Sequence, residues 1–441
     1  MRIFLIGAGQ VGSAVVEALH HEHEVMVVDT EQARLRALAE RFDVATQEAD
    51  GASRHDLAAA GIRDADLVIA CTSRDEVNLV AGMFARLEAP GATTVIRTSN
   101  VEYVDLWRSG QLDVDFVVCS ELETANAISR IIGVPAARQT DVFAEGQVQI
   151  VEFEVQEGAS RDVVDLPLRQ ASAPRDSKVA AIIRGAETLL PGGDDVIRPG
   201  DRIVVIGSPQ SAKSWGALLS PGEAVVRDVV IFGAGRVGTA IARALVEQGI
   251  GVRVVEASRA QAVRLAEALP EARVYNATGF DPDFLERERI GKAQAAVFAM
   301  RDDAKNLYAA SLAEVHGVPF TIGIAHEPVS VQAFDHAGID VSVNPRAVTA
   351  EEIIRFAHDP RTKQIALLEG SRYEVLDVTT RDTSRYVGSK FRDMPIHGAL
   401  IGAIVRNGTA IFPHGEDVLE AGDRVIVFTE SADAARVVEA L

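Results

Sequence analysis

The sequence of 441 residues has little cysteine, few aromatic residues and no excess of positive charge. Its two cysteines, Cys71 and Cys119, lie beside apolar runs without metal-ligand spacing, so we expect neither a disulfide scaffold nor a metal site. The formal net charge of −20 would repel phosphate backbones, which argues against nucleic acid as a partner. No uncharged apolar run approaches about 18 residues, so we expect no helix that inserts directly into a membrane.

Apolar residues are plentiful instead: they make up 47% of the chain, enough to bury several cores. The length allows about three domains of ordinary size, or more if they are small. The stretch MRIFLIGAG runs directly into a strand pattern and a glycine-rich turn, so we expect no secretory signal there and a cytoplasmic location.

The chain repeats a pair of different modules. A glycine-rich loop occurs twice, as Gly7, Gly9 and Gly12 and again as Gly233, Gly235 and Gly238. The segment ADLVIACTSRDEVNL (65–79) likewise recurs as AQAAVFAMRDDAKNL (293–307). A second segment, LLPGGDDVIRPGDRIVVIG (189–207), recurs as IFPHGEDVLEAGDRVIVFT (411–429). Two modules therefore alternate, and the second glycine loop opens the second copy of the pair.

The first module of each pair alternates apolar strand patterns with amphipathic helices, which predicts an α/β fold with a doubly wound, Rossmann-like parallel sheet. The second module reads as strands VQIVEFEV, KVAAIIRG and DRIVVIG separated by turns, which predicts a small α+β module. We expect Rossmann-like domains at 1–120 and 225–345, crossover helices at 121–138 and 346–361, and α+β modules at 139–220 and 362–441.

Each glycine loop follows a strand, opens a helix and precedes an acid at the end of the next strand, Asp29 or Glu256. The three glycines allow a tight turn, close approach of a pyrophosphate, and close packing of helix on strand. An acid at this position hydrogen-bonds both ribose hydroxyls and repels a 2′-phosphate. The pattern therefore favours NAD or an adenine nucleotide over NADP.

The two loops differ in charge. The first carries Gln10, and Asp50 follows its third strand, whereas the second carries Arg236 with the neutral Asn276 and Thr278. A guanidinium in the loop favours a triphosphate, or contacts a phosphate in a neighbouring subunit. We expect NAD(H) at the first loop and ATP or ADP at the second. The alternative is that the second copy has lost binding and only supports the assembly.

An NAD-dependent oxidoreductase is the rival interpretation, and it needs a proton donor near the nicotinamide. The pair Tyr386 and Lys390 has the spacing used by short-chain dehydrogenases, but Gly388 interrupts it and the segment belongs to the α+β module. We find no other acid–base candidate within a Rossmann unit, so no enzyme activity is expected.

As a set, these motifs resemble the tandem RCK (regulator of potassium conductance) family, including the TrkA-type subunits of potassium-uptake systems. The markers are GAGQVG, VVDT, AGIRDADLVIACTSRDEVN, EYVD and FAEGQV in the first half and GAGRVG, AIVRNG and LEAGDRVIVF in the second. The resemblance covers essentially the whole chain. It implies that NAD(H) and ATP or ADP are bound without turnover, and that the nucleotide sites also include Val11, Thr30, Thr72, Ser73, Arg97, Val237 and Ala277.

The same resemblance implies a homotetrameric ring at the inner face of the cell membrane, bound to a potassium-translocating subunit of the TrkH or TrkG type. A regulator of another cation transporter stays open as an alternative. The resemblance also places a short helix over VGSKFRDM (387–394). We further expect the apolar crossover helices ELETANAISRIIG and TAEEIIRFAHD to offer surface to neighbouring subunits.

Overall fold

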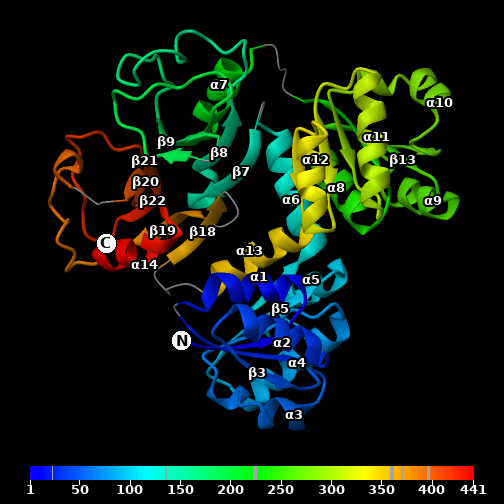
Figure 1. Ribbon diagram of the computed structural model, residues 1–441, viewed down its shortest axis with the longest axis vertical. Helices are drawn as coiled ribbons and strands as arrows, with labels where there is room; N and C mark the ends of the chain where they lie inside the picture. The colour runs from blue at the N-terminus through cyan, green and yellow to red at the C-terminus, as the bar shows by residue number, and fades with distance from the viewer. Residues whose placement is uncertain are drawn as a thin grey trace. The chain divides into compact units, whose positions relative to one another are not determined.

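The computed structural model describes residues 1–21, 23–134, 137–185, 187–221, 226–357, 362–368, 372–394 and 398–441. The chain forms two compact units, and each unit combines a segment of the first half with a segment of the second (Figure 1). One unit consists of Met1–Ile128 and Arg227–His358, and the other of Ser129–Val226 and Asp359–Leu441. Each unit is described separately below.

The first unit contains two parallel six-stranded sheets, one from each half of the chain. The first sheet has the strand order β3-β2-β1-β4-β5-β6. Its strands are β1 (Arg2–Ile6), β2 (Glu24–Asp29), β3 (Ala45–Glu48), β4 (Leu67–Ala70), β5 (Thr93–Thr98) and β6 (Phe116–Cys119). Its helices are α1 (Gln10–Leu19), α2 (Gln32–Arg41), α3 (Arg54–Ala59), α4 (Asp75–Glu88), α5 (Val101–Arg108) and the start of α6 (Ser120–Ile132).

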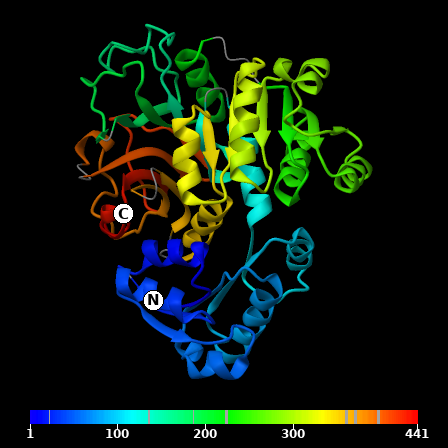
Figure 2. The same ribbon diagram turned by 45° about the vertical axis from the view of Figure 1, so that its right-hand side comes forward.

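The second sheet repeats this topology as β14-β13-β12-β15-β16-β17 (Figure 2). Its strands are β12 (Asp228–Phe232), β13 (Gly251–Glu256), β14 (Arg273–Asn276), β15 (Ala295–Phe298), β16 (Thr321–Ile324) and β17 (Val341–Val343). Its helices are α8 (Arg236–Glu247), α9 (Arg259–Ala268), α10 (Pro282–Arg287), α11 (Asp303–Val315) and α12 (Pro328–His336). The next helix, α13 (Pro345–Ala357), follows β17 in the chain and packs on α1 and on strands β5 and β6 of the first sheet. The predicted doubly wound fold is confirmed in both copies.

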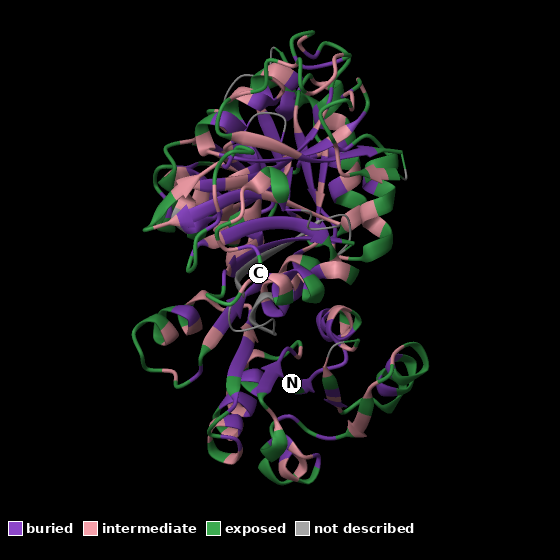
Figure 3. Cartoon of the chain, turned by 90° about the vertical axis from the view of Figure 1, so that its left-hand side faces the viewer, coloured by how far each residue is buried: buried purple, intermediate pink, exposed green. Residues whose placement is uncertain are grey.

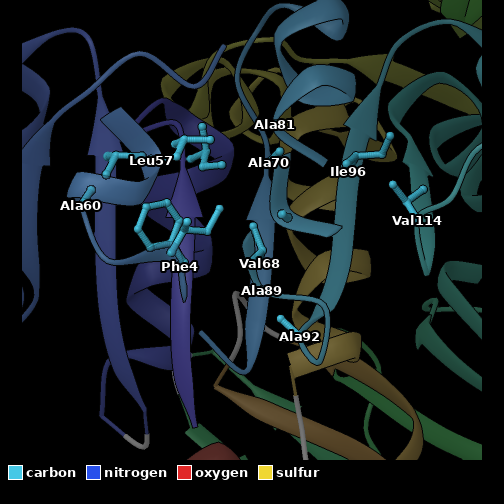
Figure 4. Close-up of a cluster of buried hydrophobic side chains, with 14 of the residues drawn as sticks. Phe4, Leu57, Ala60, Val68, Ala70, Ala81, Ala89, Ala92, Ile96 and Val114 are labelled. Carbon is cyan, nitrogen blue, oxygen red and sulfur yellow. The ribbon is translucent and has the colours of Figure 1, made fainter. Parts of the chain in front are cut away.

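Small residues on the helices allow close packing on the branched strand residues of the first sheet. Phe4, Val68 and Ile96 are almost completely buried on adjacent strands (Figure 4). A Cβ on Gly82 in α4 would lie 2.9 Å from Cγ2 of Ile96, so this helix rests directly on the strand. Burying one such aliphatic or aromatic side chain contributes about 1.5–3 kcal/mol. The sheet thereby becomes a rigid support for the loops at its carboxyl edge.

The second unit contains two antiparallel five-stranded sheets, ordered β10-β9-β11-β8-β7 and β18-β19-β22-β20-β21. The first sheet comprises β7 (Ala137–Phe143), β8 (Val148–Glu154), β9 (Ser177–Arg184), β10 (Glu187–Leu189) and β11 (Arg202–Gly207), with α7 (Pro209–Leu219). The second comprises β18 (Thr362–Leu368), β19 (Tyr373–Thr379), β20 (Ala399–Arg406), β21 (Thr409–Ile411) and β22 (Arg424–Glu430), with α14 (Ala434–Ala440). Buried residues follow the strands (Figure 3), and Ile206, Ala403 and Phe428 belong to one core shared by both modules.

One expectation for these segments is wrong. The helix expected over 387–394 is limited to a single 3₁₀ turn, Phe391–Asp393, because Gly388 adopts a φ of +82° and Lys390 forms an antiparallel bridge with Val418. In the crossover helices, the apolar side chains of Ile128 and Ile353 are fully buried within the chain.

Candidate functional site

The first glycine loop connects β1 to α1, and each glycine has a different structural reason. Gly7 has a φ of +112°, which side chains rarely adopt. A Cβ on Gly12 would lie 1.9 Å from the carbonyl oxygen of Gly7, so any side chain at this position would clash with the backbone of the turn. At Gly9, by contrast, the nearest described atom to an added Cβ is Nη1 of Arg34 at 3.8 Å. The loop is therefore closed underneath and open on the face above Gly9.

The second glycine loop, between β12 and α8, has the same geometry. Gly233 has a φ of +103°, and a Cβ on Gly238 would lie 2.0 Å from the carbonyl oxygen of Gly233. Among the described residues, no heavy atom comes within 4 Å of the Cβ position at Gly235. Both helices begin with free backbone N–H groups and a partial positive charge, which suit a bound phosphate. Val11 and Val237 lie in the first turns of α1 and α8.

Asp29 and Glu256 hold the two loops from the ends of β2 and β13. The Asp29 carboxylate accepts hydrogen bonds from the backbone N–H of Ala8 at 2.7 Å and of Glu31 at 2.8 Å. Glu256 accepts the matching bonds from Ala234 at 2.7 Å and Ser258 at 2.6 Å. Each carboxylate oxygen retains a second lone pair, so both acids can still accept from ribose hydroxyls.

A cavity of about 890 Å³ opens above the first loop. The first-site residues predicted from sequence that line it are Gly7, Gly9, Gln10, Val11, Asp29, Thr30, Asp50, Thr72, Ser73 and Arg97. Gly12 is absent from this lining because it packs beneath the loop against Gly7. Residues from the ends of five strands, β1 to β5, are thus brought to one edge of the sheet, which is where doubly wound sheets bind ligands.

Four arginines that line this cavity were not predicted: Arg34, Arg41, Arg74 and Arg346. Arg34 and Arg41 lie on α2, where their spacing reads only as the exposed face of an amphipathic helix. Arg346 comes from α13, the helix that directly follows the second Rossmann domain, far away in the sequence. The sequence held no local signal that these side chains share a cavity with the glycine loop.

Asn78 fixes the part of the first site that follows β4. It is fully buried, and its side-chain oxygen accepts from the backbone N–H of Thr72 at 2.9 Å while its amide donates to the carbonyl oxygen of Arg97 at 2.9 Å. In the second Rossmann domain, the side-chain oxygen of Asn306 likewise accepts from the backbone N–H of Met300, and its amide donates to the carbonyl oxygen of Ile324. The repetition of Asn was visible in the sequence, and its positioning role is visible only in the structure.

The structure defines which residues of the two sites correspond. The backbone N–H groups of Ala49 and Ala277 donate to the backbone carbonyl oxygens of Asp29 and Glu256, both at 3.1 Å. Of the two neutral residues noted in the second site, Thr278 is therefore the counterpart of Asp50.

Asn276 instead matches Glu48, because these two residues pair in register with Glu256 and Asp29. Its side-chain amide donates to the carbonyl oxygen of Glu256 at 2.9 Å. Neutral groups thus replace the carboxylates of Glu48 and Asp50 at these two positions, and of these two acids Asp50 lines the first cavity.

Each glycine loop also contacts the other Rossmann domain. The Gln10 side chain donates to Glu327 at 2.7 Å and accepts from Nη1 of Arg346 at 2.6 Å. In the second loop, Nη1 of Arg236 donates to Oγ of Ser99 at 2.6 Å. Burial raises the pKa of Glu121, near this contact, to about 7, although the charges of Arg236 and Arg97 oppose the shift.

Comparison with protein-family models matches both module types twice. The TrkA-N domain model matches residues 3–120 and 229–345, and the TrkA-C domain model matches residues 150–219 and 375–441.

Curated relatives match almost end to end. The chain is 32% identical over 436 residues to a Trk system potassium uptake protein TrkA homolog of Archaeoglobus fulgidus, covering 98% of this chain and 97% of that protein. It is 27% identical to the Trk system potassium uptake protein TrkA of Haemophilus influenzae, covering 97% of this chain and 95% of that protein.

Solved structures share the fold across the whole chain. The GsuK channel aligns with a TM-score of 0.64 at 15% identity, covering 99% of this chain and 78% of that chain. The GsuK channel bound to NAD aligns with a TM-score of 0.61 at 16% identity, covering 100% and 79%. Within the part of the chain that the structure describes, no helix is long and apolar enough to cross a membrane.

Proposed function

Since the chain belongs to the TrkA family of Trk potassium uptake proteins, built from tandem TrkA-N and TrkA-C domains, we propose that it is a nucleotide-sensing regulatory subunit. In this proposal NAD(H) binds at the first glycine loop and ATP or ADP at the second, and neither is turned over. Each ligand can shift the conformation of the assembly only by its difference in affinity for two states.

The cavity above the first loop carries the proposal. It joins an acid suited to ribose, Asp29, with a glycine loop that leaves space above Gly9. Arginines line the same cavity in a chain whose formal net charge is −20. Clustered guanidinium groups against that background favour an anionic ligand. A ribose–diphosphate ligand matches both features, and NAD is bound by the GsuK channel in one of the structures that share this fold.

The second loop supports a different nucleotide. Glu256 again provides a ribose acceptor, while Asn276 and Thr278 leave no carboxylate beside it at the end of β14. Arg236 adds positive charge at the first position of α8. A di- or triphosphate gains more from this balance of charge than the pyrophosphate of a dinucleotide does.

Turnover is not expected at the first site. Among the described residues that line its cavity, none is His, Tyr or Lys, which leaves no ordinary proton donor for hydride-transfer chemistry. The thiol of Cys71 lines the cavity too, but burial raises its pKa to about 12, so it stays protonated and unreactive. An NAD-dependent oxidoreductase is therefore the less favoured function, and steady loss of NADH absorbance with carbonyl substrates would support it.

We extend the proposal to assembly and partner. Apolar side chains are exposed on one helix of each Rossmann domain, with Met83 and Leu87 on α4 and Tyr308 and Val315 on α11. Exposed apolar pairs of this kind favour contacts between subunits. A homotetrameric ring at the inner face of the membrane, acting on a potassium-translocating subunit of the TrkH or TrkG type, fits the potassium-uptake systems named for the relatives.

Calorimetric titration of NADH and of ATP against two variants tests the assignment of ligands to loops. Replacing Asp29 with Ala should weaken NADH binding by about 1–3 kcal/mol, since ribose hydroxyls lose their acceptor, and leave ATP binding unchanged. Replacing Arg236 with Gln should weaken ATP binding and leave NADH binding unchanged. If Arg236→Gln weakens NADH while ATP is unaffected, the ligands are assigned to the wrong loops.

A further inference from the structure

The first nucleotide site is not built by its own domain alone. Arg346 is the second residue of α13, at the end of the second Rossmann domain, yet it lines the cavity above the first glycine loop. Its Nη1 lies 2.6 Å from the side-chain oxygen of Gln10, the first residue of α1. The guanidinium therefore stands beside the helix N-terminus that is suited to a phosphate.

The bonds that Arg346 makes leave part of its guanidinium for a ligand. Within the described part of the chain, its bonds to Gln10, to the carbonyl oxygen of His326 and to Glu327 all start from Nη1. The N–H groups of Nη2 and Nε are the ones that would grip two oxygens of one phosphate. The ion pair with Glu327 spans 3.1 Å between half-exposed side chains, and such pairs hold weakly.

The corresponding place at the second loop has the opposite arrangement. Arg346 is the second residue of α13, and its counterpart at the second position of α6 is Glu121. The loop residues are exchanged as well, since α1 begins with Gln10 and α8 begins with Arg236. At the first loop the arginine thus comes from the opposite domain, whereas at the second it belongs to the loop itself and a carboxyl faces it.

From this exchange we propose that Arg346 binds the diphosphate of the nucleotide in the first site, which makes that site shared between the two Rossmann domains. The inference rests on the proposed binding of nucleotide at the first loop and adds a specificity residue to it. Ligands with a diphosphate benefit from Arg346, and ligands without phosphate do not. The bound diphosphate and Glu327 then share one guanidinium, so occupancy of the first site is communicated to the second domain.

The test uses the full-length chain with Gly235→Val, so that a side chain fills the open space at the second loop and only the first site is titrated. NADH, ADP and adenosine are each titrated by calorimetry against this parent and against Arg346→Gln. We expect the variant to bind NADH and ADP about 10–100 times more weakly, the loss of a bidentate charge-assisted pair, and adenosine equally well. Arg346→Lys should be intermediate, because it retains the charge without the paired geometry.

Glu327→Gln is the matched control, since it breaks the same ion pair while leaving the guanidinium in place. We expect it to bind NADH more tightly than the parent, because a carboxylate that repels the diphosphate and partly neutralises Arg346 is removed. Equal weakening in Glu327→Gln and Arg346→Gln would overturn the proposal and assign Arg346 to holding the two domains together.

Three other outcomes would also overturn it. If adenosine binding falls as much as ADP binding, the variant has damaged the site as a whole. A parent that binds NADH and ADP, with Arg346→Gln unchanged, refutes the role of Arg346 alone. A parent that binds none of the three ligands refutes the proposed function at the first loop as well.

Discussion

Glu121 is a buried carboxyl whose charge state changes in the neutral range. Burial raises its pKa to about 7 from an ordinary value of 4.5, against the opposing charges of Arg236 and Arg97. Between these two values the folded protein binds a proton that the unfolded chain does not. Stability contributed by this group is therefore lost as pH rises from about 4.5 to about 7, and above that range the buried charge is a constant cost.

Replacing Glu121 with Gln should therefore stabilise the protein at alkaline pH. We expect the free energy of unfolding at pH 8 to rise by about 2–3 kcal/mol, and the advantage to disappear near pH 4.5, where both side chains are neutral. Thermal unfolding of both proteins between pH 4.5 and 8 measures this. A variant less stable than the parent at pH 8 would show instead that the carboxylate is ionised and held by Arg236.

The residues that could be predicted at the nucleotide sites are those defined by local backbone geometry. The glycine roles and the acid after the second strand follow from a strand–turn–helix pattern within one module, and the structure gives each of these residues a physical reason. Arg34 and Arg346 could not be found in this way. A surface arginine has the same pattern whether it faces solvent or a cavity, and Arg346 reaches the first loop only through the packing of two domains.

The glycine loop that connects each first strand to its helix tolerates substitution very differently from one glycine to the next. At the second loop, an added Cβ at Gly238 would meet a backbone carbonyl at 2.0 Å, whereas at Gly235 it would meet open space. These two positions, three residues apart, separate the requirements of folding from those of ligand binding.

Substitutions at these two glycines should separate stability from binding. Gly238→Ala should lower the stability of the second Rossmann domain by more than about 3 kcal/mol, since the clash is with backbone. Gly235→Val should keep the thermal unfolding temperature of the parent and abolish ATP binding. Circular dichroism melting and ATP titration of both variants check this, and equal destabilisation by the two would refute the division of roles.

The order of elements in both Rossmann domains could be predicted, because helix and strand periods differ and the module occurs twice. The α+β modules were harder: β7, β10 and α7 were not predicted, since a short edge strand such as Glu187–Leu189 has too few residues to show alternation. Motif comparison identified Asn276 and Thr278 as neutral residues but not which of them corresponds to Asp50, because only pairing between strands fixes the register.

At the scale of the whole molecule, the proposed assembly needs an apolar contact surface, and we expect exposed residues on α4 to provide it. Met83 and Leu87 lie one turn apart on α4, and their side chains are 62% and 63% exposed. Covering such a patch is favourable in proportion to the area buried.

Replacing both Met83 and Leu87 with Glu should reduce the mass of the assembly. Charged groups at a subunit contact would be desolvated without partners, so we expect dissociation from a tetramer to smaller species at micromolar concentration. Val263→Glu is the control, because Val263 is an exposed apolar residue on a different helix, α9. Light scattering measures the mass of the parent and of both variants. A parent that is already monomeric would refute the proposed ring.

Both compact units are completed only when the second half of the chain is present. During translation, the face of α1 that meets α13 therefore stays uncovered until about residue 357 has left the ribosome, several tens of seconds at ordinary elongation rates. Because one chain carries both copies of the module, a substitution alters one glycine loop and not the other. The difference between Gln10 and Arg236, and between Arg346 and Glu121, is a change of this kind.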